Sequence, residues 1–288
     1  MSSTLEVIDV SQFNGTVAWP KVEADGAIIR LGYRGYGSAG TLKMDSKFKL
    51  NTTGAANAGI PYGVYWLSQA TSDAEALEEA EYIIDALDGL TLTFPVYLDS
   101  EYSNTSHTGR ADSLSKAART QYALTLLNAL KAAGFATGVY ASESWFYGSG
   151  AMLDVSQLTD HSLWVAKYSS KTPSIGVEYD AWQYTDSGTD AGCSGSVDKS
   201  HFYKDFANAD SSTESEEDEV VTYEDWKTYM EQYRAELQAK SGSSWSSDDR
   251  TWAIENGLFQ GNDSGEYLWQ DFLSREQAAA LFHRMSGE

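Results

Sequence analysis

The residues with the clearest chemical potential in this chain are two acidic ones, Asp99 and Glu101, at the end of an apolar run that begins at Phe94. Side chains alternate between the two faces of a β-strand, so residues two apart point the same way, about 7 Å apart along the backbone. Two carboxyl groups on one face can do acid/base chemistry when one keeps its proton while the other is ionised. Parallel barrels present their chemistry at the carboxyl ends of their strands, where this pair would lie. A solvated strand end followed by a loop is the alternative interpretation.

Apolar runs and helical patterns alternate from residue 5 to about residue 206, which is typical of a βα architecture around a parallel sheet or barrel. Apolar residues at helical spacing, closed by a glycine, predict a helix over 73–89, capped by Asp73, another over 114–134, and shorter ones over 19–26 and 45–59. Helices become sparse after residue 145, so the inferred barrel is regular in its first half and mostly β in its second. The predicted strands are 5–10, 27–33, 62–68, 94–99, 136–141, 163–168 and 181–184, with a weaker one near 196–198.

An acidic, polar stretch then breaks this rhythm and has almost nothing to bury, which predicts an inter-domain linker. Helical patterns follow it over 223–240 and 250–259. A last helix is predicted to begin at Ser274, because Ser274 and Gln277 have the spacing of a capping box. The expected division is a barrel domain over 1–206, the linker over 207–222 and a small all-helical domain over 223–288.

Composition restricts the possible partners. A net charge of −22 argues against nucleic-acid binding, which relies on Lys and Arg to neutralise phosphates, so we expect partners held by stacking and hydrogen bonds. The single cysteine, Cys193, excludes an intramolecular disulfide and fits a chain that folds in a reducing compartment. No signal-peptide pattern opens the sequence and no run reaches membrane-spanning length. We therefore expect synthesis in the cytoplasm and no membrane insertion.

Several common site patterns are incomplete. The four histidines are dispersed without ligand spacing, so neither a metal site nor a cofactor is expected. Residues 35–40 match the glycine pattern of dinucleotide-binding turns, but no helix opens directly after them and no acidic residue follows about 20 positions on. We interpret this segment as a flexible loop at the barrel mouth. No Gly-x-Ser-x-Gly elbow occurs, which removes the commonest serine-hydrolase pattern.

Six separated motifs, taken in their order and spacing, resemble glycoside hydrolase family 25, the muramidase type of lysozyme that is common in phage endolysins of Gram-positive hosts. The resemblance covers about residues 5–206. It implies an α/β fold, an irregular TIM-like (β/α)5β3 barrel, which agrees with the thinning of the helices. The motifs are Val-Ile-Asp-Val-Ser at 7–11, Gly-Val-Tyr at 63–65, Leu-Asp-Ser-Glu at 98–101, Leu-Trp-Val-Ala at 163–166, Trp-Gln-Tyr at 182–184 and Val-Asp at 197–198.

The resemblance implies a catalytic cluster of four acidic residues, Asp9, Asp99, Glu101 and Asp198, with Glu101 as the proton donor. All four stand at predicted strand ends, which converge on one face of a barrel. Crowded carboxylates repel one another, and we expect Glu101 to be the least solvated and to keep its proton to the highest pH. Turn or ion-pair roles are the alternative for Asp9 and Asp198.

Aromatic residues on the predicted strands near the same end could hold a glycan by stacking on the faces of its sugars. The resemblance places Tyr65 and Trp182 at the substrate, and core packing is the alternative for each candidate. The five candidates are Tyr65, Tyr140, Tyr168, Trp182 and Tyr184.

The implied activity is hydrolysis of the β-1,4 bond between N-acetylmuramic acid and N-acetylglucosamine in the peptidoglycan of Gram-positive walls, reached after release by a holin or by lysis. Retention assisted by the substrate's own 2-acetamido group, oriented by Asp99, is favoured, because the i, i+2 pair sets Asp99 beside the acid rather than across the sugar ring. Direct attack by Asp99 or Asp9 stays open. Two other functions also stay open: a non-catalytic protein that binds wall glycans, and a chitinase-like glycosidase.

The end of the chain resembles a single S-layer-homology unit, through residues 252–261 and 274–284. In that family three tandem copies jointly build a site for a cell-wall polymer, whereas this chain has one copy. The resemblance implies that residues 223–288 bind a secondary cell-wall polymer or associate with a second copy of the chain, which would restore multivalency. A purely stabilising helical appendage is the alternative.

Overall fold

The computed structural model describes residues 4–204, 206, 227, 231, 233–235, 237–243, 246–262, 265–271 and 274–286. The chain divides into two compact units, Met1–Thr213 and Glu214–Glu288, which we call the N-terminal unit and the C-terminal unit. The predicted linker over 207–222 and half of the predicted helix over 223–240 lie outside the described residues.

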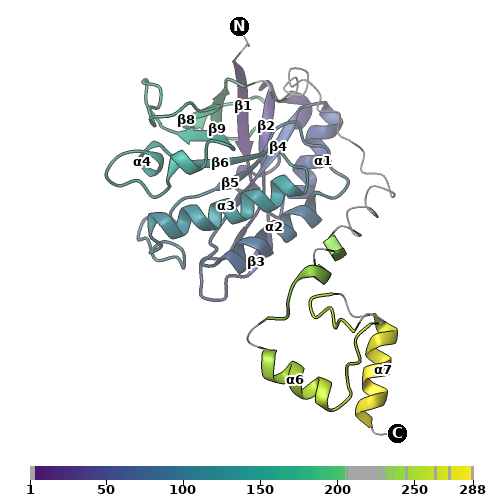
Figure 1. Cartoon of the computed structure of the whole chain (residues 1–288). Helices are drawn as coiled ribbons and strands as arrows, with labels where there is room; N and C mark the ends of the chain where they lie inside the picture. Colours follow the sequence, from purple (N-terminus) through teal and green to yellow (C-terminus); the bar gives the residue numbers. More distant parts are fainter. Residues whose placement is uncertain are drawn as a thin grey trace. The chain divides into compact units, whose positions relative to one another are not determined.

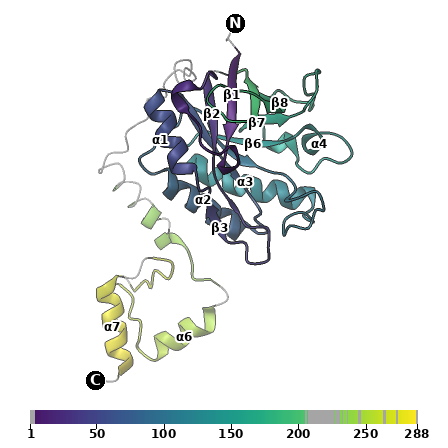
Figure 2. The same cartoon turned by 180° about the vertical axis from the view of Figure 1, so that it is seen from behind.

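The N-terminal unit is a closed barrel of eight strands, seen from two sides in Figures 1 and 2. Neighbouring strands from β1 round to β8 are parallel, whereas β9 runs antiparallel to both β8 and β1 and closes the ring. The irregular α/β barrel expected from the sequence is therefore confirmed. The barrel strands are β1 Leu5–Val10, β2 Gly26–Arg34, β4 Tyr62–Leu67, β5 Val96–Asp99, β6 Thr137–Ser142, β7 Ser162–Ala166, β8 Ala181–Gly188 and β9 Val197–Phe202.

A hairpin at the end of β2 was not expected from the sequence. Its second arm is the short strand β3, Leu42–Met44, which pairs antiparallel with β2. The glycine-rich residues 35–40 form its turn, in which the amide of Gly35 donates to the carbonyl of Thr41 (2.9 Å). The predicted loop is thus a hydrogen-bonded hairpin turn, and its flexibility stays a prediction.

The helices lie close to their predicted positions, with two corrections. The segment over 19–26 forms only the 3₁₀ turn η2, Trp19–Lys21, because the Asp190 carboxylate accepts the next free amides, those of Glu23 and Ala24 (both 3.1 Å). The cap of α2 is Ser72 and not Asp73, since the Ser72 hydroxyl accepts from the amide of Glu75. The helices are α1 Phe48–Ala58, α2 Asp73–Leu87, α3 Lys116–Ala132 and α4 Glu143–Phe146, and the other 3₁₀ turns are η1 Gln12–Asn14 and η3 Val155–Gln157.

From β1 to β7 the barrel strands are largely buried on both faces, which explains their mostly apolar sequences, whereas β8 beyond Gln183 and much of β9 are polar and partly exposed. Outward residues such as Ile29, Leu98 and Val139 belong to the larger core, which they share with α1, α2 and α3. Figure 1 shows these three helices along one side of the barrel, while β8 and β9 lie away from them. Inward residues fill the barrel itself, and their large aromatic rings pack edge-on or tilted against one another. This second core is Val7, Ile28, Phe94, Tyr97, Trp164, Ala181 and Phe202.

The C-terminal unit contains α6, Ser247–Glu255, and α7, Arg275–Ser286. The predicted capping box of the last helix is confirmed, since the Ser274 amide donates to Gln277 Oε1 (2.8 Å) and the Gln277 amide donates to Ser274 Oγ (3.1 Å). Trp269 stacks on Tyr267 at a centroid distance of 5.2 Å and packs against Phe259 at the same distance. Within the part of the chain that the structure describes, no helix is long and apolar enough to cross a membrane.

A buried ion pair ties the barrel to its helical cover. Arg34, at the end of β2, is only 2% exposed, and its Nε lies 2.7 Å from Oε1 of the fully buried Glu79 on α2. Its Nη1 donates to the carbonyl of Gly40 in the hairpin turn (2.8 Å), and its Nη2 contacts Glu78 (2.7 Å). Burial raises the pKa of Glu79 even beside this cation. The guanidinium of Arg34 therefore joins the hairpin to α2.

We expect Arg34→Met to destabilise the protein by about 3–5 kcal/mol at neutral pH, because it leaves the Glu79 carboxylate buried without its cation. Urea unfolding at pH 7 measures this loss. The control is Glu78→Gln, which removes the half-exposed partner of the same arginine and should cost less than about 1 kcal/mol. Equal losses of stability for the two variants would show that burial of the Arg34–Glu79 pair contributes nothing to the stability of the fold.

Candidate active site

The structure brings the four predicted carboxylates together at the mouth of the barrel. Asp9 and Asp99 stand at the carboxyl ends of β1 and β5, and Glu101 follows two residues later. Asp198 is at the start of β9, and it reaches the same end only because β9 runs antiparallel, which makes Asp198 the register partner of Asp9. These residues line a cavity of about 170 Å³, together with Tyr65, Tyr140, Trp164, Tyr168 and Gln183.

Two residues of this cavity were not predicted, Trp164 of the inner core and Gln183, and of these Gln183 contacts the acids directly. Its Nε2 donates to Asp9 (2.9 Å) and to Asp198 (3.4 Å), while its Oε1 accepts from the phenols of Tyr140 (2.7 Å) and Tyr168 (2.9 Å). The two phenols therefore fix which end of the amide faces the acids. Strand alternation could have found it, since Gln183 is the polar residue between two aromatic neighbours.

The five candidate aromatic residues separate into two groups. Tyr65, Tyr140 and Tyr168 line the cavity. Trp182 and Tyr184 flank the inward Gln183 and so point to the other face of β8. There, Tyr184 stacks on His201 at 4.4 Å and donates to Glu6 (2.5 Å), and Trp182 donates to the carbonyl of Lys167 (2.8 Å). The structure therefore does not bring Trp182 and Tyr184 to the carboxylates.

Crowding and burial disturb the titration of all four carboxyl groups. Burial, and then the charge of Asp198, raises the pKa of Asp9, and burial with the charge of Glu101 does the same for Asp99. Desolvation raises the pKa of Glu101, although Arg30 opposes it, and burial together with Asp186 raises that of Asp198 to about 6.

The expected order of solvation is wrong. Asp9 and Asp99 are 8% and 6% exposed, whereas Glu101 is an exposed residue. Glu101 follows the end of β5 and stands at the rim, while Asp99 still belongs to the strand and points into the barrel. The candidate acid is thus the carboxyl group that a substrate reaches first, not the least solvated one.

A wider groove continues from the carboxylate cavity. Its volume is about 600 Å³, and it shares Glu101, Tyr140 and Tyr168 with the cavity. On its floor Tyr102 stacks on His107 at 3.6 Å, and His107 holds the left-handed backbone conformation, φ +51°, that favours glycine. The sequence analysis did not predict this groove, because its lining joins the ends of β5, β6 and β7 with residues of the segments that follow them. The rest of its lining is Asn104, Thr105, Ser142, Trp145, Ala166 and Lys167.

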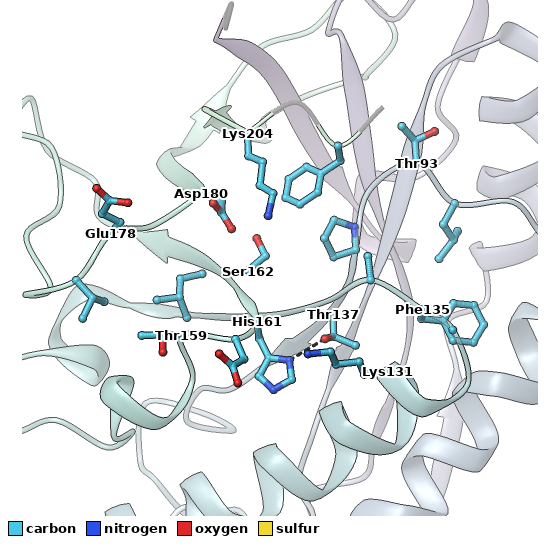
Figure 3. A pocket seen from close by; sticks show the side chains of 18 residues that line it. Thr93, Lys131, Phe135, Thr137, Thr159, His161, Ser162, Glu178, Asp180 and Lys204 are labelled. Carbon is cyan, nitrogen blue, oxygen red and sulfur yellow. Dashed lines mark hydrogen bonds between the residues drawn. The ribbon is translucent and has the colours of Figure 1, made fainter. Parts of the chain in front are cut away.

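A larger cavity lies at the other end of the barrel. It holds about 1010 Å³, and Figure 3 shows His161 and Ser162 near the start of β7 facing Asp180 and Lys204 across it. The His161 ring is hydrogen-bonded to the Thr137 hydroxyl (2.7 Å). None of the predicted site residues lines this cavity. In barrels of this kind, the end at which parallel strands begin contributes to stability rather than chemistry.

Comparison with known proteins now decides the family. The model of Glycosyl hydrolases family 25 matches residues 8–193, which is more than half of the chain. The chain belongs to this family.

Within the described residues, no group of three or more His, Cys, Asp or Glu side chains has the arrangement of a metal site, and the acidic cluster is no exception.

Two known proteins are similar to this chain over about two thirds of its length. The autolytic lysozyme of Clostridium acetobutylicum is 30% identical over 196 residues, which cover 68% of this chain and 55% of that protein. The modular autolysin LytC of Streptococcus pneumoniae, solved with a synthetic peptidoglycan ligand, is 30% identical with a TM-score of 0.59, over 69% of this chain and 47% of that one. The chain thus spans about half the length of these two relatives.

A third similarity covers the whole chain. The structure of the CTP1L endolysin matches 99% of this chain and 100% of its own length, with 22% identity and a TM-score of 0.59. At this identity the likeness concerns the fold alone.

Neutralising Asp198 should make the protein more stable at neutral pH, and the sign follows from proton binding. An Asp of ordinary pKa, 3.8, in the unfolded chain binds fewer protons than folded Asp198 with its pKa of about 6, so stability falls as pH rises between these values. We expect Asp198→Asn to match the wild type below about pH 4 and to exceed it above about pH 6 in urea unfolding.

The control for this experiment is Asp154→Asn, at a carboxylate whose pKa is lowered by hydrogen bonds from Gln157 and Ser156. Its effect should have the opposite sign, with stability lost at neutral pH. A pH-independent effect of Asp198→Asn would contradict the expected titration.

Proposed function

We propose that this protein is a peptidoglycan hydrolase, an N-acetylmuramidase that cleaves the β-1,4 bond between N-acetylmuramic acid and N-acetylglucosamine at the bacterial cell wall. The observation that carries the proposal is the cluster of Asp9, Asp99, Glu101 and Asp198 around one cavity in a family 25 barrel. The lysozyme and autolysin names of the relatives support the same substrate. No cofactor enters the proposal, because carboxyl groups suffice for glycosidic hydrolysis.

In this proposal Glu101 protonates the glycosidic oxygen. Three facts support the assignment: Glu101 lines both the carboxylate cavity and the groove, it is exposed at the rim, and its pKa is raised by desolvation. An acid must hold its proton until the substrate arrives, and it must reach the leaving oxygen. Tyr140 and Tyr168 line the same two spaces and would contact the sugar on either side of that oxygen.

Asp99 would orient the substrate's 2-acetamido group, which then attacks the anomeric carbon. Its buried position, two residues before the acid in the chain, supports this role over attack from across the sugar ring. Asp9 and Asp198 would hold the polar floor through Gln183. A covalent glycosyl-enzyme on Asp99 or Asp9, formed while a thiazoline inhibitor fails to bind, would replace substrate assistance by direct attack.

We expect Glu101→Gln to lower kcat on peptidoglycan by about 10²–10⁴-fold, the usual contribution of a positioned general acid. Mass spectrometry of digested walls identifies the bond that is cleaved. The wild type should give fragments with muramic acid at the new reducing ends, and the variant should release almost no fragments while its unfolding midpoint stays unchanged. Glu81→Gln, on the exposed surface of α2, is the matched control and should retain activity.

The same digest separates the competing functions. Glucosamine at the new reducing ends, or faster cleavage of chitin oligomers, would make the protein a chitinase-like glycosidase. Wall binding by the wild type without any fragments would make it a non-catalytic glycan-binding protein.

We also propose that the C-terminal unit binds a secondary cell-wall polymer or joins two copies of the chain. Supporting features are the confirmed capping box of α7 and a cavity of about 440 Å³ on this unit. Its lining includes Phe259, Tyr267 and Trp269, which offer aromatic faces to a polymer.

Removing residues 214–288 should therefore weaken co-sedimentation with purified walls while the hydrolysis of soluble glycan strands is kept. Light scattering distinguishes the two roles. If the unit joins two copies, its removal lowers the measured molar mass from a multiple of the chain to a single copy, whereas removal of a polymer-binding unit leaves the number of copies unchanged. Unchanged wall binding and unchanged assembly would assign this unit a purely stabilising role.

A further inference from the structure

Exposed aromatic rings also occur at the barrel mouth on the side away from the groove. Phe13, in η1 directly after β1, is 79% exposed, and Tyr36, in the turn of the β2–β3 hairpin, is 38% exposed. Tyr33 lies between them, with its ring centroid 6.0 Å from that of Tyr36. None of the cavities described above includes these residues.

A buried cation supports these rings from below. The guanidinium of Arg30 lies 5.4 Å from the centroid of Phe13 and 4.8 Å from that of Tyr33, within range for cation–π attraction. Arg30 is 7% exposed, and Asp45 holds its Nε at 3.5 Å. Arg30 therefore contacts the rings of Phe13 and Tyr33, while most of the Phe13 side chain stays exposed to solvent.

Hydrogen bonds hold the hairpin turn that carries Tyr36. The amide of Arg110 donates to the carbonyl of Tyr36 (3.1 Å), and Arg34 donates to the carbonyl of Gly40 (2.8 Å). Gly40 has φ +53°, and a Cβ at this position would collide with the guanidinium of Arg110. The turn therefore requires glycine here.

The order of strands around the barrel places these rings opposite the groove. Going round the ring as β1, β2, β4, β5, β6, β7, β8 and β9, the strand β2 stands directly across from β7. The rings come from β2 and the turns that follow β1 and β2, whereas the groove comes from the ends of β5, β6 and β7. The four carboxylates stand between the two sides.

Two further observations tie the rings to the carboxylates. Arg30 is the register partner of Tyr65, which lines the carboxylate cavity. Burial raises the pKa of Tyr36; Arg30 lowers it, and the charges of Glu101 and Asp99 raise it further, so its phenol is within electrostatic reach of both acids.

We propose that Phe13 and Tyr36 form a second sugar-binding subsite, which stacks on the N-acetylated hexosamine rings of the glycan beyond the scissile bond, opposite the groove. A polymeric substrate must leave the carboxylates on two sides, and the groove accounts for one of them. Flat aromatic faces bind the apolar faces of pyranose rings without a positive charge, which suits a protein of net charge −22. This inference rests on the proposed muramidase function and gives its substrate site a second half.

The test compares Phe13→Ala/Tyr36→Ala with the wild type on soluble, peptide-free glycan strands of four, six and eight sugars. We expect kcat/KM of the wild type to rise with length and the double variant to lose that rise. On eight sugars the loss should be about tenfold, the equivalent of removing one buried aromatic contact, and it should appear mainly in KM. On the shortest strand the two proteins should differ by less than about twofold.

Matched variants separate stacking from a structural role. Tyr36→Phe keeps the ring and should behave as the wild type, and Tyr203→Ala removes an equally exposed tyrosine that directly follows β9 at the other end of the barrel. Equal losses on all three lengths, or no loss on eight sugars, would overturn the subsite. An absence of cleavage by the wild type at every length would instead overturn the muramidase function itself.

Discussion

Mutual repulsion among four carboxyl groups at one end of a barrel is the constraint around which the mouth is organised. Asp9 and Asp99 are almost fully buried, and their ordinary ionised forms would be unstable so close together. The protein offsets this cost with a fixed amide, Gln183, between Asp9 and Asp198, and with a buried cation, Arg30, which acts on Asp99 and Glu101. Asp9 and Asp198 thus share a neutral amide donor, and Asp99 and Glu101 share a nearby positive charge.

The reversed strand β9 makes this arrangement possible. In an all-parallel barrel, residue 198 at the start of a strand would lie at the opposite end from Asp9. Because β9 runs antiparallel to β1, Asp198 faces Asp9 in register and adds a fourth acid. The reversal also explains why no helix lies between β8 and β9, since a strand that turns back directly can pair with its predecessor without a crossover.

The mouth has two different sides, and the hairpin side depends on two arginines that are not at the reaction centre. Arg34 joins the β2–β3 hairpin to α2, and Arg110 holds the turn that presents Tyr36. On the other side, the loop after β5 carries Tyr102 and His107 into the groove. A glycan that crosses the carboxylates would therefore meet a hydrogen-bonded hairpin on one side and a loop on the other.

The sequence by itself determined most of the barrel strands and the helices α1, α2 and α3, because strand alternation and helical spacing are local properties of the chain, while the order of its motifs, through the family resemblance, implied the barrel and the set of four acids. It did not determine which of these acids is solvated, since Glu101 stands beyond the end of β5 while Asp99 still belongs to the strand. Only the tertiary structure decided that Gln183 faces the acids while Trp182 and Tyr184 face away, because one register between β8 and β9 fixes all three. Only the tertiary structure showed the hairpin and the groove as well, because hydrogen bonds and packing between residues distant in the sequence hold them.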